Sequence, residues 1–416
     1  MTLYSPFFIL AFLPLSAAVY NKMPCSAKST FLCVINLAFY IFASGKHFVL
    51  LPFLALLVYA ISFIGKKGFY ICLFLLVLLH FAGVSEVGVS FFILRSASYI
   101  YDGHREKNFL KVFAFLLFFP CIHAGPLARY KDFEKDFNRD MNYSRIARGI
   151  CLFLVGALKK LFFADPLFSA FDLFFSASTT LSAFFALICY ALYIYFDFSG
   201  CSDMARGIAL MFGFEIPKNF DFPYMSKSVG EFFRRWHITL GRWLFDYIYV
   251  PLGGSKCGRA RMVFALFVSW LVSALWHGFA FSYLLWGMYF FLLCTAEKLF
   301  LQKGKRVGRL TTLLLVLLGW VLFFSNTPLD AFLFYKRLFA FGDVLLYSRA
   351  DIYNTTRYLP FIMLSALCAS PVLHSVFCTL YKKVRVLVYV SAPIAAVLAL
   401  SCLVIGGHKP FLYATF

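Results

Sequence analysis

The chain has 416 residues, of which 62% are hydrophobic and only 14% are charged, and its mean hydropathy is +0.81. A soluble domain of this composition would aggregate, so the composition indicates an integral membrane protein and excludes an ordinary soluble enzyme. The formal net charge of +20 comes from lysines and arginines in short connectors, a pattern that the positive-inside rule explains and that would also attract an acidic cytoplasmic partner.

Apolar segments that reach, or nearly reach, the span of about 20 residues needed to cross a bilayer recur along the whole chain. They lie at about 3–20, 29–44, 48–64, 68–84, 109–124, 148–170, 178–198, 262–278, 280–300, 309–325, 357–380 and 386–406. Several are short enough to be tilted or re-entrant. We therefore expect an all-α polytopic membrane protein with about 11–13 transmembrane or re-entrant helices. The first segment lacks a basic region before it, so we expect a retained helix rather than a cleaved signal.

No polar linker divides the chain, which predicts a single integral-membrane domain over residues 1–416. Two regions interrupt the apolar pattern: a polar connector at 125–147 and a semi-polar insert at 199–261. We see no internal repeat, which argues against a transporter built from duplicated halves. The cysteines are scattered singly in apolar runs and the histidines lack ligand spacing, so neither a disulfide framework nor a bound metal is expected.

The insert contains the stretch "SVGEFFRRWHITLGRWLFDYIYVPLGG" at 228–254, which we read as a helix that starts at Ser228. Ser228 and Glu231 form a capping-box pattern at that start. Ion pairs at i,i+4 are expected between Glu231 and Arg235 and between Arg242 and Asp246. An aromatic stripe at helical spacing joins Trp236, Leu240, Trp243 and Tyr247. Taken alone, the stretch is typical of an amphipathic helix in the lipid headgroup region, in which a histidine has no special role.

Other polar groups lie within apolar surroundings. Asp197 ends an apolar segment, and Asp203 and Arg206 are spaced to pair on a helix. These groups form either a structural polar network or the wall of a substrate tunnel. His277 ends the helix "MVFALFVSWLVSALWH" and precedes Gly278. It is either a core histidine whose hydrogen-bonding groups have partners or a general base in a dry cavity. In the second case Gly278 would let a substrate approach the backbone.

The ordered set of motifs resembles the membrane-bound O-acyltransferase (MBOAT) family. The resemblance is to the bacterial branch that O-acetylates alginate or peptidoglycan or D-alanylates teichoic acid. "RRWHITLGRWLFDYIYVPLGG" and "LVSALWHG" carry it most clearly, and "VGVSFFILRSASYIYD", "HAGPLARYKDF" and "YFDFSGCSDMARGIALMFGF" extend it over most of the chain. Cys201 replaces the family's usual aromatic residue, and the arginine common after its G-W-V-x-F motif is absent. "YVPLGG" is more similar to the acetylating members.

The resemblance implies a ring of helices around a thin centre, where a cytoplasmic funnel meets an extracytoplasmic opening. It also implies that His277 is the catalytic histidine and that His237 is the second histidine of the site. Arg234 and Arg235 would bind donor phosphates or lipid headgroups. Trp236 and Trp276 would shape the cavity, as would Tyr195. Asp197 and Asp203 would belong to the polar network around the substrate path.

Acyl transfer from a thioester to a hydroxyl requires a base for the hydroxyl and stabilisation of the oxyanion. His277 is the candidate base. No G-x-S-x-G elbow is present, which favours direct attack by the acceptor hydroxyl over an acyl-serine enzyme. The resemblance implies no bound cofactor, a donor thioester carried by acetyl-CoA or an acyl carrier protein, and an acceptor on a cell-envelope polysaccharide.

We therefore expect a multi-pass protein of the bacterial cytoplasmic membrane that works with an extracytoplasmic acetyltransferase partner. Nucleic acid is not expected as a partner, because the basic residues are spread over membrane loops. D-alanyl transfer from a carrier protein to teichoic acid is the closest alternative. A proton-coupled transporter that uses His277 and Asp197 as a relay is the alternative of another class.

Overall fold

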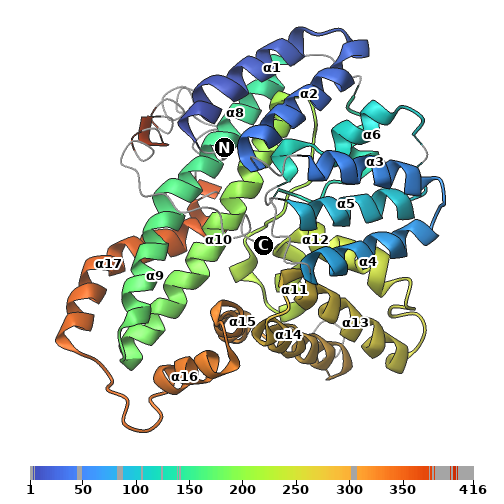
Figure 1. Ribbon diagram of the computed structural model, residues 1–416. Coiled ribbons are helices and arrows are strands. Elements are labelled where there is room, and N and C mark those ends of the chain that lie inside the picture. Colours follow the sequence, from blue (N-terminus) through green and yellow to red (C-terminus); the bar gives the residue numbers. More distant parts are fainter. Residues whose placement is uncertain are drawn as a thin grey trace. The chain divides into compact units, whose positions relative to one another are not determined.

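The computed structural model describes residues 5–44, 49–81, 88–104, 106–122, 125–137, 142–300 and 307–373, together with single residues and short pieces outside these ranges. Every regular element in this part of the chain is a helix, which confirms the predicted all-α class (Figure 1). Four of the described helices are apolar and long enough to cross a bilayer. They are α2 (Cys25–Ser44), α10 (Thr180–Met211), α13 (Arg259–His277) and α14 (Phe281–Phe300).

The chain folds into two compact units. The first unit comprises residues 1–158, 198–219 and 394–416, and the second comprises 159–197 and 220–393. Besides α2 and the second half of α10, the described elements of the first unit are the π-helix η1 (Phe8–Phe12), α1 (Leu13–Lys22), α3 (Leu50–Ser62), α4 (Lys67–Phe81), α5 (Val89–Tyr101), α6 (Phe109–Leu116), η3 (Phe119–Cys121), α7 (Tyr130–Glu134) and α8 (Tyr143–Leu158). The predicted connector at 125–147 thus contains α7 and the start of α8.

Besides α13, α14 and the first half of α10, the second unit contains η4 (Lys159–Ala164), α9 (Asp165–Ser176), η5 (Pro223–Met225), α11 (Val229–Arg235), α12 (Ile238–Leu244), η6 (Phe245–Tyr249), α15 (Arg309–Phe324), α16 (Pro328–Leu338) and α17 (Arg349–Cys368). In this unit α14 packs between α13 and α15, and α11 lies against α14 and α15 (Figure 1).

Helix α5 forms the core of the first unit and was not among the predicted spans. Every residue from Val89 to Ile100 is buried, and the helix packs on α3, α4 and α6. Arg95 interrupts the apolar run, which is why hydropathy misses the helix. Its guanidinium donates to the Phe115 carbonyl at the end of α6 and lies 4.5 Å from the centroid of the Phe115 ring. A helix C-terminus favours a cation, so α6 supplies part of the compensation for this buried charge.

Helix α10 corrects the prediction that an apolar helix ends at Asp197, because it continues to Met211. Its polar second half packs closely on α8 through glycines. A Cβ atom on Gly207 would lie 2.6 Å from the Gly149 carbonyl oxygen, and one on Gly156 would lie 2.5 Å from the Gly200 carbonyl oxygen. Small residues let two helix backbones approach in this way and gain van der Waals contact. Residues 199–211, the first part of the predicted insert, therefore belong to helix α10.

The apolar segment predicted at 148–170 is divided by a π-helical turn. Helix α8 ends at Leu158, the π-helix η4 spans Lys159–Ala164, and α9 follows with Pro166 in its first turn. Proline lacks an N–H group and its ring clashes with the carbonyl four residues earlier, so an α-helical ladder cannot run unchanged through this point. The wider turn carries Lys160, whose side chain is buried.

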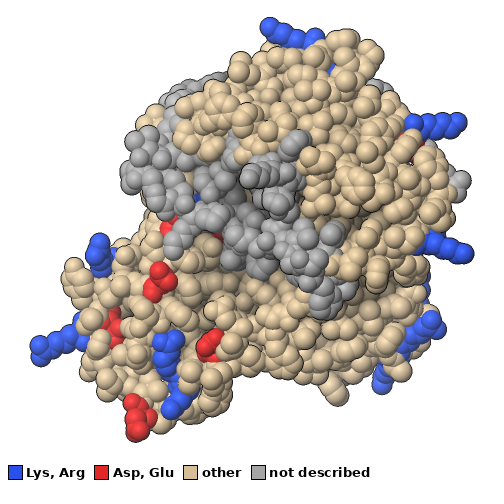
Figure 2. Space-filling model, in the orientation of Figure 1, with Lys and Arg blue, Asp and Glu red and all other residues tan. Residues whose placement is uncertain are grey.

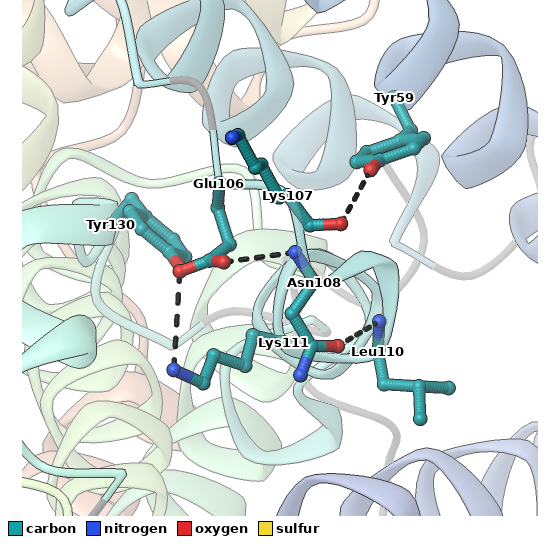
Figure 3. A network of polar contacts seen from close by, with 7 residues as sticks. All are labelled: Tyr59, Glu106, Lys107, Asn108, Leu110, Lys111 and Tyr130. Carbon is teal, nitrogen blue, oxygen red and sulfur yellow. Dashed lines mark hydrogen bonds and ion pairs between the residues drawn. The ribbon is translucent and has the colours of Figure 1, made fainter.

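A polar network in the first unit joins the segment around the start of α6 to α7 (Figure 3). The Glu106 carboxylate accepts hydrogen bonds from the Asn108 backbone N–H at 2.8 Å and from the Tyr130 hydroxyl at 3.1 Å. The Lys111 ammonium lies 3.9 Å from the same carboxylate. Asn108 caps α6 by accepting from the Leu110 N–H at 3.0 Å. The network therefore ties the start of α6 to α7.

The molecular surface is largely apolar. Leu10, Leu310 and Phe300 are 64%, 71% and 81% exposed. Figure 2 shows acidic and basic side chains gathered at the lower left of that view, while most of the other described surface on this face is uncharged. Exposed side chains of this kind are stable against lipid tails, as expected for an integral membrane protein.

Candidate active site around His237 and His277

Helix α11 begins where the capping pattern predicts. The Ser228 side chain accepts a hydrogen bond from the Glu231 N–H at 3.0 Å, and the predicted Glu231–Arg235 ion pair closes at 2.8 Å. The contacts differ from a standard capping box in one detail. The Glu231 carboxylate accepts a hydrogen bond from the Lys227 N–H at 3.1 Å, whereas in the standard box it accepts from the N–H of the capping residue itself. These contacts confirm the start of the helix at Ser228.

The continuous helix predicted beyond Ser228 is wrong, because the chain breaks at Trp236 and His237. Helix α11 ends at Arg235, and His237 adopts the left-handed conformation with φ of 45° and ψ of 52° before α12 starts at Ile238. A non-glycine residue in this region costs about 1–2 kcal/mol, and such strain persists where surrounding contacts impose it. The predicted stripe from Trp236 to Tyr247 is thus divided between the break, α12 and η6.

His277 is the last residue of α13 and is only 5% exposed. Gly278 follows with φ of 147°, a conformation that favours glycine. A Cβ atom on Gly278 would lie 2.9 Å from the ring of Tyr283. Glycine is therefore required on both conformational and steric grounds directly after the candidate base.

Trp276 contacts both histidines. Its ring centroid lies 5.9 Å from that of His237 and 4.7 Å from that of His277, and both ring pairs are edge to face. His237 is 4% exposed and Trp276 is 3% exposed. The structure thus brings together three of the predicted site residues, from the α11–α12 break and from the end of α13.

Aromatic side chains from α14 and α15 pack around His277 and Trp236. The His277 ring centroid lies 5.1 Å from that of Trp286 and 5.0 Å from that of Phe323. Trp236 packs on Trp320 at 4.9 Å. Trp286, Phe323 and Trp320 were not predicted as site residues, although Trp320 and Phe323 belong to the G-W-V-x-F motif. Aromatic residues are common in apolar helices, and only the fold places these three here.

Burial and the neighbouring His277 imidazole lower the pKa of His237 well below its usual range. A low dielectric disfavours the charged imidazolium, so burial favours the neutral form of His237. A neutral imidazole can accept a proton at one nitrogen and donate a hydrogen bond from the other. This is the protonation state required of a residue that orients or exchanges protons during acyl transfer.

The two predicted arginines occupy different positions. The Arg235 guanidinium is engaged with Glu231 and also donates to the Asp221 carbonyl at 3.5 Å. Arg234 is exposed. Arg234 is therefore the more exposed of the two, although 35% of the Arg235 side chain is also exposed.

Asp197 belongs to a buried ionic cluster of the second unit. The Lys160 ammonium lies 2.7 Å from the Asp197 carboxylate and 2.9 Å from the Asp165 carboxylate. Lys160 was not predicted as part of this network, although the lysine pair 159–160 and Asp165 stand out inside an apolar run. Asp203 lies in the first unit, where the predicted pair with Arg206 is present at 3.4 Å. These contacts fit the polar-network interpretation of both aspartates.

The fold and these contacts define a helical membrane protein with a buried, histidine-containing site lined by aromatic side chains. The chain belongs to the MBOAT, membrane-bound O-acyltransferase family, whose profile matches residues 37–307. That range includes both histidines and all the other predicted site residues.

Three relatives illustrate what the chain is similar to. It is 39% identical over 270 residues to a probable alginate O-acetylase of Pseudomonas putida, covering 62% of this chain and 56% of that protein. It is 28% identical over 357 residues to a peptidoglycan O-acetyltransferase of Helicobacter pylori, covering 68% of each. It is 27% identical over 259 residues to a teichoic acid D-alanyltransferase of Bacillus subtilis, covering 56% of this chain and 66% of that protein. The chain spans about half the length of the alginate-related proteins that it matches.

Proposed function

We propose that the chain is an O-acyltransferase that moves an acetyl group from a thioester to the hydroxyl of a cell-envelope polysaccharide. Family membership supports O-acyl transfer in general. The 39% identity to a probable alginate O-acetylase, against 27% to a D-alanyltransferase, favours acetyl as the acyl group. The structural observation that carries the proposal is the pair of buried histidines that share Trp276.

His277 acts as the general base in this proposal. As the acceptor oxygen attacks the thioester carbonyl carbon, its proton passes to the imidazole and a C–O bond forms. The tetrahedral intermediate then collapses, the C–S bond breaks, and the imidazolium returns the proton to the departing thiolate. The step balances with an ester and a free thiol as products, and it needs no acyl-enzyme.

His237 orients the acyl donor or assists the proton transfer, for which the neutral imidazole that burial favours is suited. Trp276 and Trp236 shape the cavity beside the histidines. Arg234, being exposed, is the better of the two arginines for an anionic donor group. Asp197 and Asp203 act as network residues.

The donor in this proposal is acetyl-CoA or an acyl carrier protein on the cytoplasmic side. The acceptor lies outside, so the protein passes the acyl group across the bacterial cytoplasmic membrane, which it spans several times. An extracytoplasmic acetyltransferase partner accepts the group or delivers it to the polysaccharide. The basic connectors favour an acidic donor on the cytoplasmic side.

The test replaces His277 with Ala in a strain that depends on this chain, after membrane insertion has been verified. Ester-linked acetate on the envelope polysaccharide is then released by mild base and measured. We expect a loss of roughly 10²- to 10⁴-fold, the usual contribution of a general base. His104→Ala is the matched control, because His104 lies in the first unit, with its ring centroid 5.1 Å from that of Tyr130, and outside the candidate site.

Wild-type ester levels in the His277→Ala strain would refute the mechanism. D-alanyl esters in place of acetate would establish the closest alternative. The transporter alternative predicts solute flux in vesicles that hold the purified protein, with no transfer of labelled acetyl groups.

A further inference from the structure

The start of α11 is held by a carboxylate from another helix. Glu297 lies in the last turn of α14, and its two carboxylate oxygens accept hydrogen bonds from the Val229 N–H at 2.5 Å and the Gly230 N–H at 2.8 Å. Val229 and Gly230 are the first two residues of α11. The first N–H groups of a helix have no partner inside it, and a negative charge at this end is favourable.

Together with Ser228, Glu297 satisfies the first three N–H groups of α11, since Ser228 accepts from Glu231. The helix has only seven residues. A helix so short is not stable by itself and takes its position from its tertiary contacts. The Glu297 carboxylate is therefore a main determinant of where α11 lies.

Gly230 makes room for this contact. A Cβ atom on Gly230 would lie 3.2 Å from a Glu297 carboxylate oxygen and 3.6 Å from a guanidinium nitrogen of Arg234. A side chain at this position would press on the carboxylate. Glycine at the second residue of α11 thus lets the carboxylate approach two successive backbone N–H groups.

Lys298, the residue next to Glu297, contacts the C-terminal end of the segment 229–249. The Lys298 ammonium donates to the Tyr249 hydroxyl at 2.8 Å and lies 4.5 Å from the centroid of its ring. Tyr249 is the last residue of η6. Two adjacent residues of α14 therefore fix both ends of the segment 229–249, which contains His237.

Two further contacts hold α11 at its C-terminal end and on the side that faces α14. At its C-terminal end, the Arg235 carbonyl accepts from the Asp221 N–H at 3.0 Å. Phe233 packs on Phe290 of α14 with ring centroids 4.8 Å apart. Because α11 is a single short helix that Trp236 and His237 follow directly, a displacement at Val229 would also shift these two residues.

We propose that Glu297 is a positioning residue for His237. Its carboxylate sets the depth and rotation of α11 against α14, and through α11 it sets where the His237 imidazole lies relative to Trp276 and His277. The catalytic part of this inference rests on the proposed acyl transfer. Glu297 itself takes no part in bond making or proton transfer.

The test compares Glu297→Gln, Glu297→Asp and wild-type protein, all purified in detergent and shown to be monodisperse. The first readout is amide hydrogen exchange over residues 229–237. We expect faster exchange in Glu297→Gln, because the amide NH₂ group cannot accept from a backbone N–H. Glu297→Asp keeps the charge on a shorter side chain and should lie between the two. Glu215→Gln is the matched control, since Glu215 is 58% exposed and lies in the first unit.

The second readout is the acyl-transfer rate. We expect kcat to fall about 10- to 100-fold in Glu297→Gln, as displaced catalytic groups do. KM for the thioester should rise as well, because Arg234, the proposed contact for the anionic donor group, lies on the same helix. If Glu297→Gln does not fold, Gly230→Ala replaces it, since the added methyl group presses on the carboxylate and should act in the same direction.

Unchanged exchange over 229–237 would overturn the proposal, and so would faster exchange with wild-type kcat. An inactive wild-type protein would instead reject the proposed acyl transfer. The exchange measurement would then decide by itself whether Glu297 holds α11 and His237.

Discussion

His237 and Trp276 pack edge to face with ring centroids 5.9 Å apart, although 38 residues of chain separate them. The contact joins the break after α11 to the end of α13, where His277 directly follows Trp276 in the chain. The indole therefore fixes the position of one histidine relative to the other.

Trp276→Phe and Trp276→Ala should show this coupling. Phenylalanine keeps an aromatic edge beside both imidazoles, so we expect partial activity. Removing the ring altogether should cost about 3–5 kcal/mol of stability, as truncation of a buried tryptophan usually does, and most of the acyl transfer. Thermal unfolding in detergent and ester formation measure the two effects. Equal activity in the two variants would contradict the positioning role of the indole.

Replacing His237 with Asn separates backbone strain from imidazole chemistry. Asparagine tolerates the left-handed conformation that His237 adopts, whereas alanine pays the strain of about 1–2 kcal/mol there. We expect both variants to lose acyl transfer, and we expect His237→Asn to be more stable than His237→Ala. Thermal unfolding and transfer rate, measured on the same preparations, check this. An active His237→Asn enzyme would mean that His237 has a conformational role alone.

Gly278→Ala should destabilise more than Gly258→Ala, although both glycines have positive φ and flank α13. A Cβ atom on Gly258 meets nothing within 4 Å, whereas one on Gly278 meets the Tyr283 ring at 2.9 Å. The clash with Tyr283 should add about 1–3 kcal/mol to the loss of stability that the positive φ causes at both positions. Thermal unfolding measures the difference, and trimming Tyr283 in the Gly278→Ala background should recover the part caused by the clash. Equal losses at the two glycines would contradict the predicted close contact with Tyr283.

Lys160→Met should leave the Asp165 and Asp197 carboxylates buried without their shared ammonium. Breaking a buried ion pair from one side costs about 3–5 kcal/mol, so we expect a lower unfolding temperature. Adding Asp197→Asn should recover part of the loss, because one of the two buried charges is removed. Lys159→Met, at the neighbouring and less buried lysine, serves as the control and should have a small effect. A stable Lys160→Met protein would show that the cluster is not needed for folding.

Local sequence signals predicted the local features well. The start of α11, the Glu231–Arg235 pair and the Asp203–Arg206 pair all depend on residues at most four positions apart. Such contacts depend on helical spacing alone, which is readable from the sequence.

The features that were missed depend on distant partners. The left-handed conformation of His237 carries no sequence signal, because it is imposed by packing around a non-glycine residue. Helix α5 was missed because a buried Arg95 counts as polar until its carbonyl partner on α6 is known. Glu297 reaches α11 from 67 residues away, and Lys160 reaches Asp197 from 37. Tertiary structure decides these contacts, and periodicity cannot reveal them.

The glycines between α8 and α10 have a consequence for how this protein tolerates insertions and deletions. Gly149 faces Gly207 and Gly156 faces Gly200, so the same seven-residue spacing runs in opposite directions on the two helices. Adding or deleting one residue between Gly200 and Gly207 would rotate one partner by about 100° relative to the other. Only one of the two close approaches could then survive. Length changes in this part of α10 should therefore be far more damaging than substitutions on its other faces.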